Sequence, residues 1–374
     1  MRSGTYINQL EGETRYKAFV PNELPFVLQS DPNIPVLLSR ADMALGRLDG
    51  VGDILPNVDF FILMYVRKEA TLSSQIEGTQ ATFTDVLKAE AKIEDLEIHK
   101  DVDEVLNYIK AMNYGLQQLD SIPLSIGLIK QIHEKLLSGV RGEWKSPGEF
   151  RRSQNWIGGA SINTATFVPP PHTEVMRLMG NLETFLHNED QLPVLIKTAI
   201  MHAQFETIHP FLDGNGRIGR LLLTFYLCQQ GILRRPLLYL SDFFKAHRQA
   251  YYDALNAYRV HDDIEGWLKF FLEGVRVTSE KATESARKIN ELRESHLKAI
   301  STLGRSTRAA RQLLDHIYSS PMIRVSDVER ITKLSNPSAL YLVDRFEKLG
   351  ILHEVTGKKR NRVFAYQDYI ALFS

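Results

Sequence analysis

The sequence has a single cysteine, Cys228, among its 374 residues, and its acidic and basic residues balance at 45 each. One cysteine excludes a disulfide within the chain and a zinc site built from several cysteines. A net charge of zero gives no overall field that would recruit nucleic acid or a membrane surface. Cys228 lies in the apolar run LLLTFYLCQQ, which is typical of a small core residue.

Long hydrophobic runs are also missing. The longest one near the start, FFILMYV at residues 60–66, is far shorter than the ~20 residues needed to cross a bilayer. The opening residues MRSGTYINQLEGET contain no apolar stretch of the kind found in secretory signals. We therefore expect a cytoplasmic protein with no membrane partner.

The rest of the composition is that of an ordinary globular protein, with 44% hydrophobic and 24% charged residues. The length favours two or three domains. Apolar residues recur every three to four positions along most of the chain, whereas the alternation typical of strands is scarce. The sequence therefore predicts a mainly helical, all-α fold, with helices at about 59–78, 83–94, 101–119, 125–138, 174–187, 193–207, 216–230, 244–258 and 263–276.

Shifts in composition divide the chain into four parts. An N-terminal helical region spans residues 1–119, and its first 50 residues are Pro-rich and read as irregular except for a helical piece around PVLLSRADMALGRLDG. A helical core spans 120–276, a charged connector helix 277–304, and a separate domain 305–374. Within the core, residues 142–172 are rich in Gly, Pro and Trp, and we interpret them as a β-hairpin around a Gly-Gly turn.

The C-terminal domain combines three short helical runs with two β-like runs around a basic turn. This order is typical of a winged helix-turn-helix. The domain is basic, with 12 Lys and Arg against 7 Asp and Glu. Its recognition helix at 335–350 carries few cations, but the turn could contact phosphates through Lys358, Lys359, Arg360 and Arg362. Binding of DNA and binding of protein both stay open for this domain.

The stretch HPFLDGNGRIGR, residues 209–220, concentrates polar and glycine residues between two apolar helical runs. A glycine-rich turn that opens a helix presents free N–H groups to an anion. Arg217 and Arg220 project from nearly the same face of that helix, so a triphosphate suits the site. Asp213 would repel phosphate unless Mg²⁺ bridges the two. His209, at the edge of the turn, could accept a proton.

Two other interpretations of this stretch fit less well. GNGRIG matches the dinucleotide-binding pattern G-x-G-x-x-G, but the preceding VLIKTAIMHAQFETIH is helical and no βαβ unit surrounds it. A metal hydrolase with His202, His209 and Asp213 as ligands lacks further clustered ligands, and the neighbouring arginines would repel the metal.

HPFLDGNGRIGR resembles the motif of Fic-domain proteins, H-x-F-x-[D/E]-G-N-G-R-x-x-R, at every fixed position. The resemblance covers about residues 120–275, including IHEKLL, PGEFR and the expected hairpin. It implies a helical core that transfers AMP from ATP to a Ser, Thr or Tyr hydroxyl of a target protein. It also implies that His209 is the general base, that Phe211 is a core anchor and that Asp213 holds magnesium.

The resemblance assigns nucleotide-binding roles along the same motif and beyond it. The backbone of Gly214 to Gly216, with the Asn215 side chain, would form the anion hole, and Arg217 and Arg220 would bind the outer phosphates; Ile218 and Gly219 belong to the same nucleotide-binding stretch. The hairpin would be a flap over the nucleotide near Ile157 and Gly158. Two tyrosines, Tyr251 and Tyr252, would flank the base.

A second stretch, LSSQIEG at 72–78, resembles the inhibitory helix of the same family through the pattern [S/T]-x-x-x-E-[G/N]. The resemblance implies that Glu77 pairs with Arg220 and takes the space of the ATP γ-phosphate. Two rival functions stay open: a DNA-binding regulator whose core only senses nucleotide, and an enzyme that removes AMP with Glu77 placing the water. The intact His209 argues against the first, because binding alone needs no base. Self-association into a homodimer also stays open.

Overall fold

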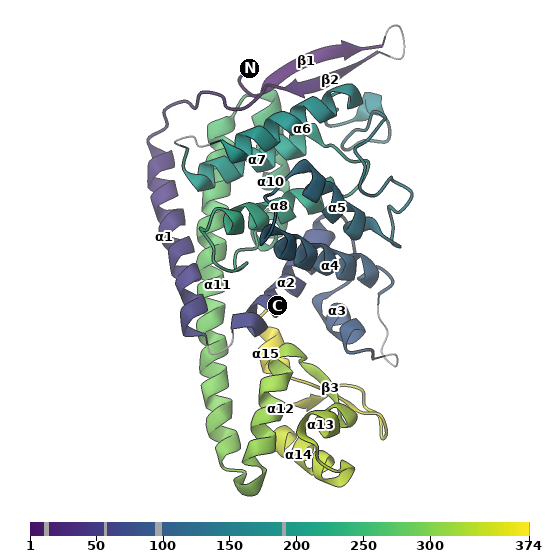
Figure 1. Ribbon diagram of the computed structural model, residues 1–374, viewed down its shortest axis with the longest axis vertical. Coiled ribbons are helices and arrows are strands. Elements are labelled where there is room, and N and C mark those ends of the chain that lie inside the picture. Colours follow the sequence, from purple (N-terminus) through teal and green to yellow (C-terminus); the bar gives the residue numbers. More distant parts are fainter. Residues whose placement is uncertain (11–14, 56–57, 94–98, 189–191, 374) are drawn as a thin grey trace.

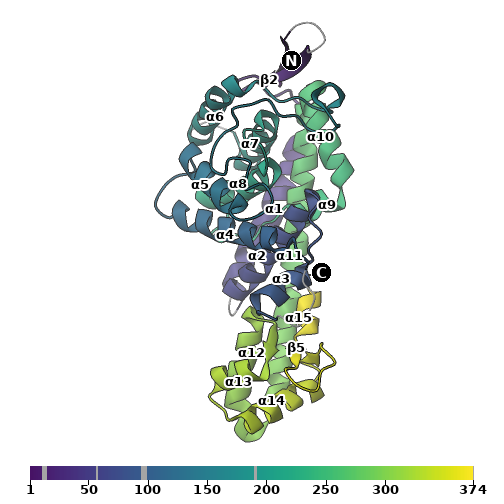
Figure 2. The same ribbon diagram turned by 90° about the vertical axis from the view of Figure 1, so that its right-hand side faces the viewer.

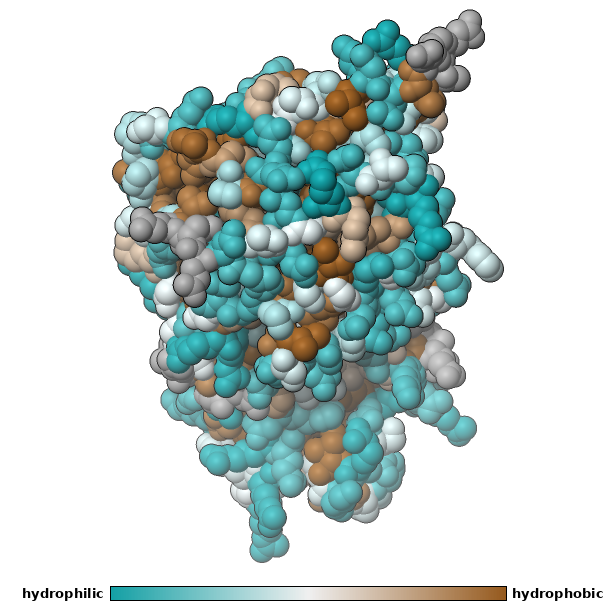
Figure 3. All heavy atoms as spheres, turned by 45° about the horizontal axis from the view of Figure 1, so that its top comes forward, coloured by the Kyte–Doolittle hydropathy of each residue, from teal (hydrophilic) through white to brown (hydrophobic). Residues whose placement is uncertain are grey.

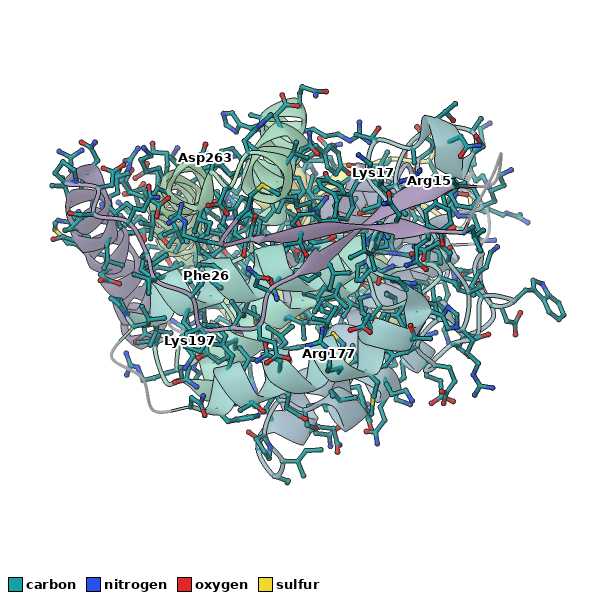
Figure 4. All side chains as sticks on the ribbon, turned by 90° about the horizontal axis from the view of Figure 1, so that it is seen from above. Arg15, Lys17, Phe26, Arg177, Lys197 and Asp263 are labelled. Atoms are coloured by element: carbon teal, nitrogen blue, oxygen red, sulfur yellow. The ribbon has the colours of Figure 1, made fainter. Side chains whose placement is uncertain are left out.

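The structure is a computed structural model that describes residues 1–10, 15–55, 58–93, 99–188 and 192–373 (Figure 1). It begins with an antiparallel hairpin of β1 (Gly4–Gln9) and β2 (Tyr16–Pro21), in which Gly4 faces Pro21. This hairpin corrects the prediction that the N-terminal residues are irregular. Neither GTYINQ nor YKAFVP alternates strictly between apolar and polar residues, and the hairpin depends on packing such as the edge-on contact of Tyr6 with Phe19. Seen from above, it lies across α6 and α7 (Figure 4).

Eleven helices of the described residues follow and form the body of the molecule. They are α1 (Asn33–Ile54), α2 (Val58–Ile76), α3 (Phe83–Glu90), α4 (Val102–Leu119), α5 (Ile126–Leu137), α6 (His172–His187), α7 (Val194–Ile208), α8 (Asn215–Gln229), α9 (Ser241–Ala246), α10 (Arg248–Val260) and α11 (Ile264–Ser301). Each helix expected from the apolar spacing is present. The mainly helical fold predicted from the sequence is therefore confirmed.

Three helix boundaries differ from the expected ones. The helix expected at 83–94 ends at Glu90, because Lys92 adopts a left-handed conformation with φ 51°. The helix expected at 244–258 is two helices that meet at His247, whose φ of −116° and ψ of 39° are not helical. The helix at 263–276 and the connector are one helix of 38 residues, α11, which runs the length of the molecule in Figures 1 and 2.

Helix α7 lies at the centre of the body. Every residue from Leu195 to Ile208 is buried, so the helix has no solvent face. Helix α8 packs beside it after a short turn, and its residues from Ile218 to Leu227, apart from a few polar ones, are core. The turn between α7 and α8 therefore holds residues 209–214 at a fixed place in the core.

The segment 142–172 is not the hairpin expected from the sequence. It forms a loop with a single antiparallel bridge between Ile157 and Phe167 and one short 3₁₀ turn, Ile162–Thr164. Gly158 and Gly159 have φ of 69° and 71°, so the chain leaves the extended conformation after one residue pair and the ladder ends there. Phe19 of the N-terminal hairpin donates its N–H to Val168 at 2.9 Å, which ties this loop to β2.

The C-terminal region contains α12 (Thr307–Ser319), α13 (Val325–Thr332), α14 (Asn336–Lys348) and the short α15 (Gln367–Ala371). Three short strands, β3 (Met322–Arg324), β4 (His353–Glu354) and β5 (Val363–Ala365), form an antiparallel sheet in the order β3-β5-β4. Three helical runs followed by two strands around a basic turn is the order of elements expected from the sequence; β3 and α15 are additions to it.

The end of the chain returns to the helical body (Figures 1 and 2). Phe373 is 2% exposed and contacts the rings of Phe61 and Tyr65 on α2 and of Phe83 on α3, at 5.3–6.4 Å between ring centres. Arg67 of α2 also donates to the carbonyl of Ser319 at 3.2 Å. The C-terminal region is therefore packed directly against the first half of α2.

On the face turned forward in Figure 3, hydrophobic patches lie between hydrophilic residues. Among the described residues, no helix combines the length and the apolar character that crossing a membrane requires.

Candidate active site

The turn between α7 and α8 is held by buried polar contacts to its backbone. His209 ends α7 in a left-handed conformation, with φ 49°, and its N–H donates to Phe205 O at 2.9 Å. The carbonyl of His209 accepts from Arg151 Nε at 2.9 Å. Arg151 is 3% exposed and also donates to the carbonyl of Pro170. A strained backbone at position 209 persists because these neighbours determine it.

The Asn215 side chain closes the turn. Its Oδ1 accepts from the N–H of Phe211 and its Nδ2 donates to the carbonyl of the same residue, both at 2.8 Å. Phe211 is fully buried and stacks on His133, with ring centres 3.7 Å apart. The expectation that the Asn215 amide contributes to the anion hole differs from this geometry, because both ends of the amide are already used to shape the loop.

The first turn of α8 is open toward a cavity. Its N-cap residue, Gly214, has φ 79° and offers no side-chain cap to the first N–H groups. Uncapped N–H groups at the positive end of a helix favour a bound anion. Gly216 lies at the wall of the cavity, where a Cβ would collide with the carboxylate of Glu77. An acidic side chain therefore already rests on this helix N-terminus.

The cavity has a volume of about 570 Å³. It brings together most of the side chains expected at a nucleotide site: Glu77, Ile157, Gly158, His209, Gly216, Arg220, Tyr251 and Tyr252 all line it. The remaining predicted residues, Asp213, Gly214, Asn215, Arg217, Ile218 and Gly219, do not belong to its lining. Residues from five separate parts of the chain thus meet at one pocket of a size that suits a nucleotide.

His209 faces this cavity in its neutral form. Burial lowers the pKa of His209 to about 3, and the guanidiniums of Arg259 and Arg151 add to that effect. Its Nδ1 is buried and has no hydrogen-bond partner among the described residues. A neutral imidazole carries a proton on one ring nitrogen and can accept a proton at the other, which a general base must do.

Glu77 and Arg220, which both line the cavity, form an ion pair. Arg220 Nη2 lies 2.8 Å from Glu77 Oε1, and the two side chains are 1% and 34% exposed. Arg220 also donates to the Oγ and the carbonyl of Ser73, at 2.8 and 3.0 Å. Burial alone would raise the pKa of Glu77, but Arg220 outweighs it and holds that pKa below its usual value. Glu77 is therefore ionised and bound to the arginine.

Arg217 does not line the cavity and points toward Glu104 of α4. It is 2% exposed, with Nη1 3.6 Å from Glu104 of α4 and Nη2 3.3 Å from Asp213. This arrangement differs from the expectation that Arg217 faces the outer phosphates together with Arg220. Glu104 was missed by sequence reasoning, because nothing in the residues around it links it to a motif about 110 positions further on.

Asp213 is the residue that the sequence predicts as the magnesium ligand. Its Oδ1 accepts from the N–H of Gly214 at 2.6 Å, and the side chain is 35% exposed beside the open end of α8. The described residues contain no group of three or more His, Cys, Asp or Glu that could hold a metal without other ligands. One partly exposed carboxylate, shared with Arg217, would suit Mg²⁺ if phosphate oxygens and water completed the ligand set.

Several side chains of the cavity were not singled out by sequence reasoning. Arg248 and Arg259 of α10 and Glu206 of α7 all line it. Arg259 lies over the ring of Phe167, 4.2 Å from its centre, and Arg248 over that of Tyr252. The spacing of α10 already placed Arg248 and Arg259 near Tyr251 and Tyr252, one to two turns apart, and that helical spacing was the available signal.

Comparisons with known proteins agree with this site. Residues 123–227 match the Fic/DOC family, and residues 36–117 match the Fic/DOC family N-terminal region. A probable protein adenylyltransferase of Aquifex aeolicus is 32% identical over 197 residues, 50% of this chain and 56% of that protein. The protein adenylyltransferase Fic of Aedes aegypti is 31% identical over 61% of this chain and 45% of its own length. The chain thus spans about half the length of these curated relatives.

Two solved structures share the fold. A Fic family protein from Desulfovibrio desulfuricans G20 aligns with a TM-score of 0.56 and 19% identity, over 91% of this chain and 97% of that one. A Fic domain containing signaling protein from Bacteroides thetaiotaomicron aligns with a TM-score of 0.52 and 20% identity, over 68% and 97%. The family matches and the shared fold support a Fic-domain protein, as the motif at 209–220 indicated.

Proposed function

We propose that this protein transfers AMP from ATP to a hydroxyl side chain of a target protein, and that Glu77 inhibits the transfer. One observation carries the proposal: a neutral His209 and the open N-terminus of α8 share one cavity, and Glu77 occupies the anion position between them. The names of the curated relatives, which describe protein adenylyl transfer, support the same reaction.

In the proposed reaction, His209 takes the proton of the target hydroxyl as its oxygen attacks the α-phosphorus. The bond from the α-phosphorus to the bridging oxygen breaks, and pyrophosphate leaves with that electron pair. The N–H groups at the start of α8 stabilise the charge that develops on the phosphate oxygens. Mg²⁺ bound through Asp213 would supply further charge neutralisation. The protein's main contribution is therefore positioning and electrostatics.

Glu77 inhibits because it competes for Arg220 and for space. Its carboxylate already neutralises the cation that would receive the γ-phosphate, and it rests against Gly216. A second anion at the same place would meet like charge at short range. ATP can bind productively only after Glu77 leaves Arg220.

We further assign residues 305–374 to a winged helix-turn-helix domain. Support comes from the order of three helices and the β3-β5-β4 sheet, with the basic turn between β4 and β5. On α14, Leu340 and Tyr341 are 38% and 54% exposed, so the outward face of this helix offers apolar contacts. We assign the domain to target selection rather than to a separate enzymatic step.

The test compares the wild type, Glu77→Gly and Glu77→Gly/His209→Ala, each incubated with ATP and Mg²⁺. Intact-protein mass spectrometry detects one added AMP on the chain itself or on added lysate proteins. We expect labelling to rise in the single variant and to vanish in the double variant. Gln80→Gly, at an exposed neighbouring position, is the matched control and should label like the wild type. No labelling in any variant would refute the proposed transfer.

A further inference from the structure

Glu206 is a buried carboxylate one helical turn before His209, and the proposed mechanism leaves it without a role. The residue is 5% exposed and lines the same cavity as His209 and Glu77. Its Oε1 is buried and has no hydrogen-bond partner among the described residues. Because an unpaired buried carboxylate is costly, its persistence at this position points to a function rather than to packing.

The imidazole of His209 also has a buried polar atom without a hydrogen-bond partner among the described residues. Its backbone is fixed by Arg151 and Phe205, but its Nδ1 is buried and has no well-formed hydrogen bond among the described residues. The backbone carbonyl of Glu206 lies near the ring and has only a small effect on its pKa. Glu206 Oε2 lies 3.9 Å from this Nδ1, about 1 Å beyond the length of a charge-assisted hydrogen bond. Pairing of the two groups would require the Glu206 side chain to move by about this distance.

We propose that Glu206 is a positioning residue: its carboxylate accepts the Nδ1–H of His209, so that Nε2 is the free nitrogen that takes the proton of the target hydroxyl. This inference rests on the proposed function and deepens it. A base whose second nitrogen is held by a carboxylate has a fixed tautomer and orientation, and the imidazolium formed during the reaction is stabilised.

The charged groups around Glu206 connect this role to inhibition. Burial raises the pKa of Glu206 to about 7; Arg220 opposes the rise, Glu77 adds to it, and Arg259 opposes it. Tyr251 also lies close enough to interact electrostatically with Glu206, and its hydroxyl is hydrogen-bonded to His202 Nε2 at 2.8 Å. While Glu77 is bound, its negative charge favours the neutral acid at Glu206. In the nucleotide-free protein, departure of Glu77 removes that charge, which favours ionisation of Glu206 and its pairing with His209.

The rate of AMP transfer should depend on pH through Glu206 and not through His209. His209 stays neutral over the working range because its pKa is about 3. The ionised carboxylate of Glu206 holds Nδ1–H and stabilises the imidazolium more strongly than the neutral acid does, so activity falls as the pH drops through the pKa of Glu206. In a variant without Glu77 this acidic limb lies below pH ~7, because one of the causes that raise the pKa is gone.

The kinetic test uses Glu77→Gly as the background and adds Glu206→Gln, Glu206→Asp or Glu206→Ala. Glu265→Gln, a buried glutamate on α11 outside the cavity, is the matched control. We expect Glu206→Gln to lower kcat by about 10-fold or more, with KM for ATP within about twofold, and to abolish the acidic limb. This is part of the ~10²–10⁴-fold that a general base contributes. Asp should retain more activity than Ala. An unchanged kcat and pH profile would overturn the inference.

A second readout does not depend on AMP transfer. Long-range ¹H–¹⁵N spectra of ¹⁵N-histidine-labelled protein report which ring nitrogen of His209 carries the proton, and His209→Ala identifies the signal. In Glu77→Gly we expect the proton on Nδ1 and a higher His209 pKa than in Glu77→Gly/Glu206→Gln. The same tautomer and pKa in both variants would refute the positioning role. If the expected spectra appear but no variant transfers AMP, the proposed function fails, whereas the hydrogen bond between Glu206 and His209 is established.

Discussion

The two ends of helix α2 are held in different ways. Its first half packs Phe61 and Tyr65 against Phe373 of the C-terminal region, in an apolar contact without charge. Its last turn, at Ser73, and Glu77 just beyond it are held by hydrogen bonds and one ion pair to Arg220. A bound anion does not compete with apolar contacts, whereas an ion pair with a one-third exposed carboxylate can be exchanged for another anion. The helix therefore has an anchored end and an exchangeable end.

This difference explains how one helix can be both structural and inhibitory. The triphosphate of ATP competes with Glu77 for Arg220, but it offers nothing that competes with the aromatic cluster around Phe373. Release of Glu77 therefore requires only local movement of the residues after Ile76, where Gly78 has φ 98° and open space around its Cα. Substitutions at one end should therefore leave the contacts of the other end intact.

The largest effect should come from removing the base that the exchangeable end covers. In the Glu77→Gly background, His209→Ala should lower the AMP-transfer rate by about 10²–10⁴-fold, which is the usual contribution of general-base catalysis. Circular dichroism and the melting temperature should stay close to those of the background, because only a side chain facing the cavity is shortened. A double variant that still labels at the background rate would show that another group accepts the proton.

A smaller effect should follow from weakening the exchangeable end without touching Glu77. Ser73→Ala removes the Oγ that accepts from Arg220 Nε at 2.8 Å, so the arginine is less firmly held toward α2. Hydrogen bonds to charged groups contribute about 1.5–3 kcal/mol, and part of this is recovered by the remaining contacts. We expect AMP labelling by the otherwise wild-type chain to rise by about two- to tenfold. Thr283→Ala, a buried hydroxyl on α11 that bonds within its own helix, is the control.

The smallest effect on activity should come from the anchored end. Phe373→Ala removes a buried ring and should lower stability by about 3–5 kcal/mol, seen as a melting temperature several degrees lower. Glu77 and Arg220 are untouched, so AMP labelling should stay within about twofold of the wild type. Labelling that rises as it does in Glu77→Gly would show that the C-terminal region controls the exchangeable end.

The sequence was informative where neighbouring residues carry the chemistry. Residues 209–220 contain His209, the open turn and Arg220 within twelve positions, and the structure places His209 and Arg220 in one cavity. The pairing of Glu77 with Arg220, 143 positions apart, was predicted through a family resemblance and not from the local pattern. The ion pair at 2.8 Å agrees with that prediction.

The features that sequence reasoning missed depend on distant partners. Glu104 neutralises the buried Arg217, and Phe373 fills a space between α2 and α3, but neither lies in a distinctive local pattern. The expected hairpin at 142–172 is reduced to one antiparallel residue pair, because the chain leaves the extended conformation at Gly158 and Gly159. Local propensity cannot supply such information, since packing against the rest of the chain decides it.

One measurement tests the central claim, that the ion pair at the exchangeable end of α2 holds the enzyme inactive. Initial rates of AMP incorporation are compared side by side for the wild type and Glu77→Gly at saturating ATP and Mg²⁺, with Phe373→Ala as the anchored-end control. If the released state is a minor population of about 0.1–10%, Glu77→Gly should be ~10- to 1,000-fold faster than the wild type. Equal rates for the wild type and Glu77→Gly would contradict the account.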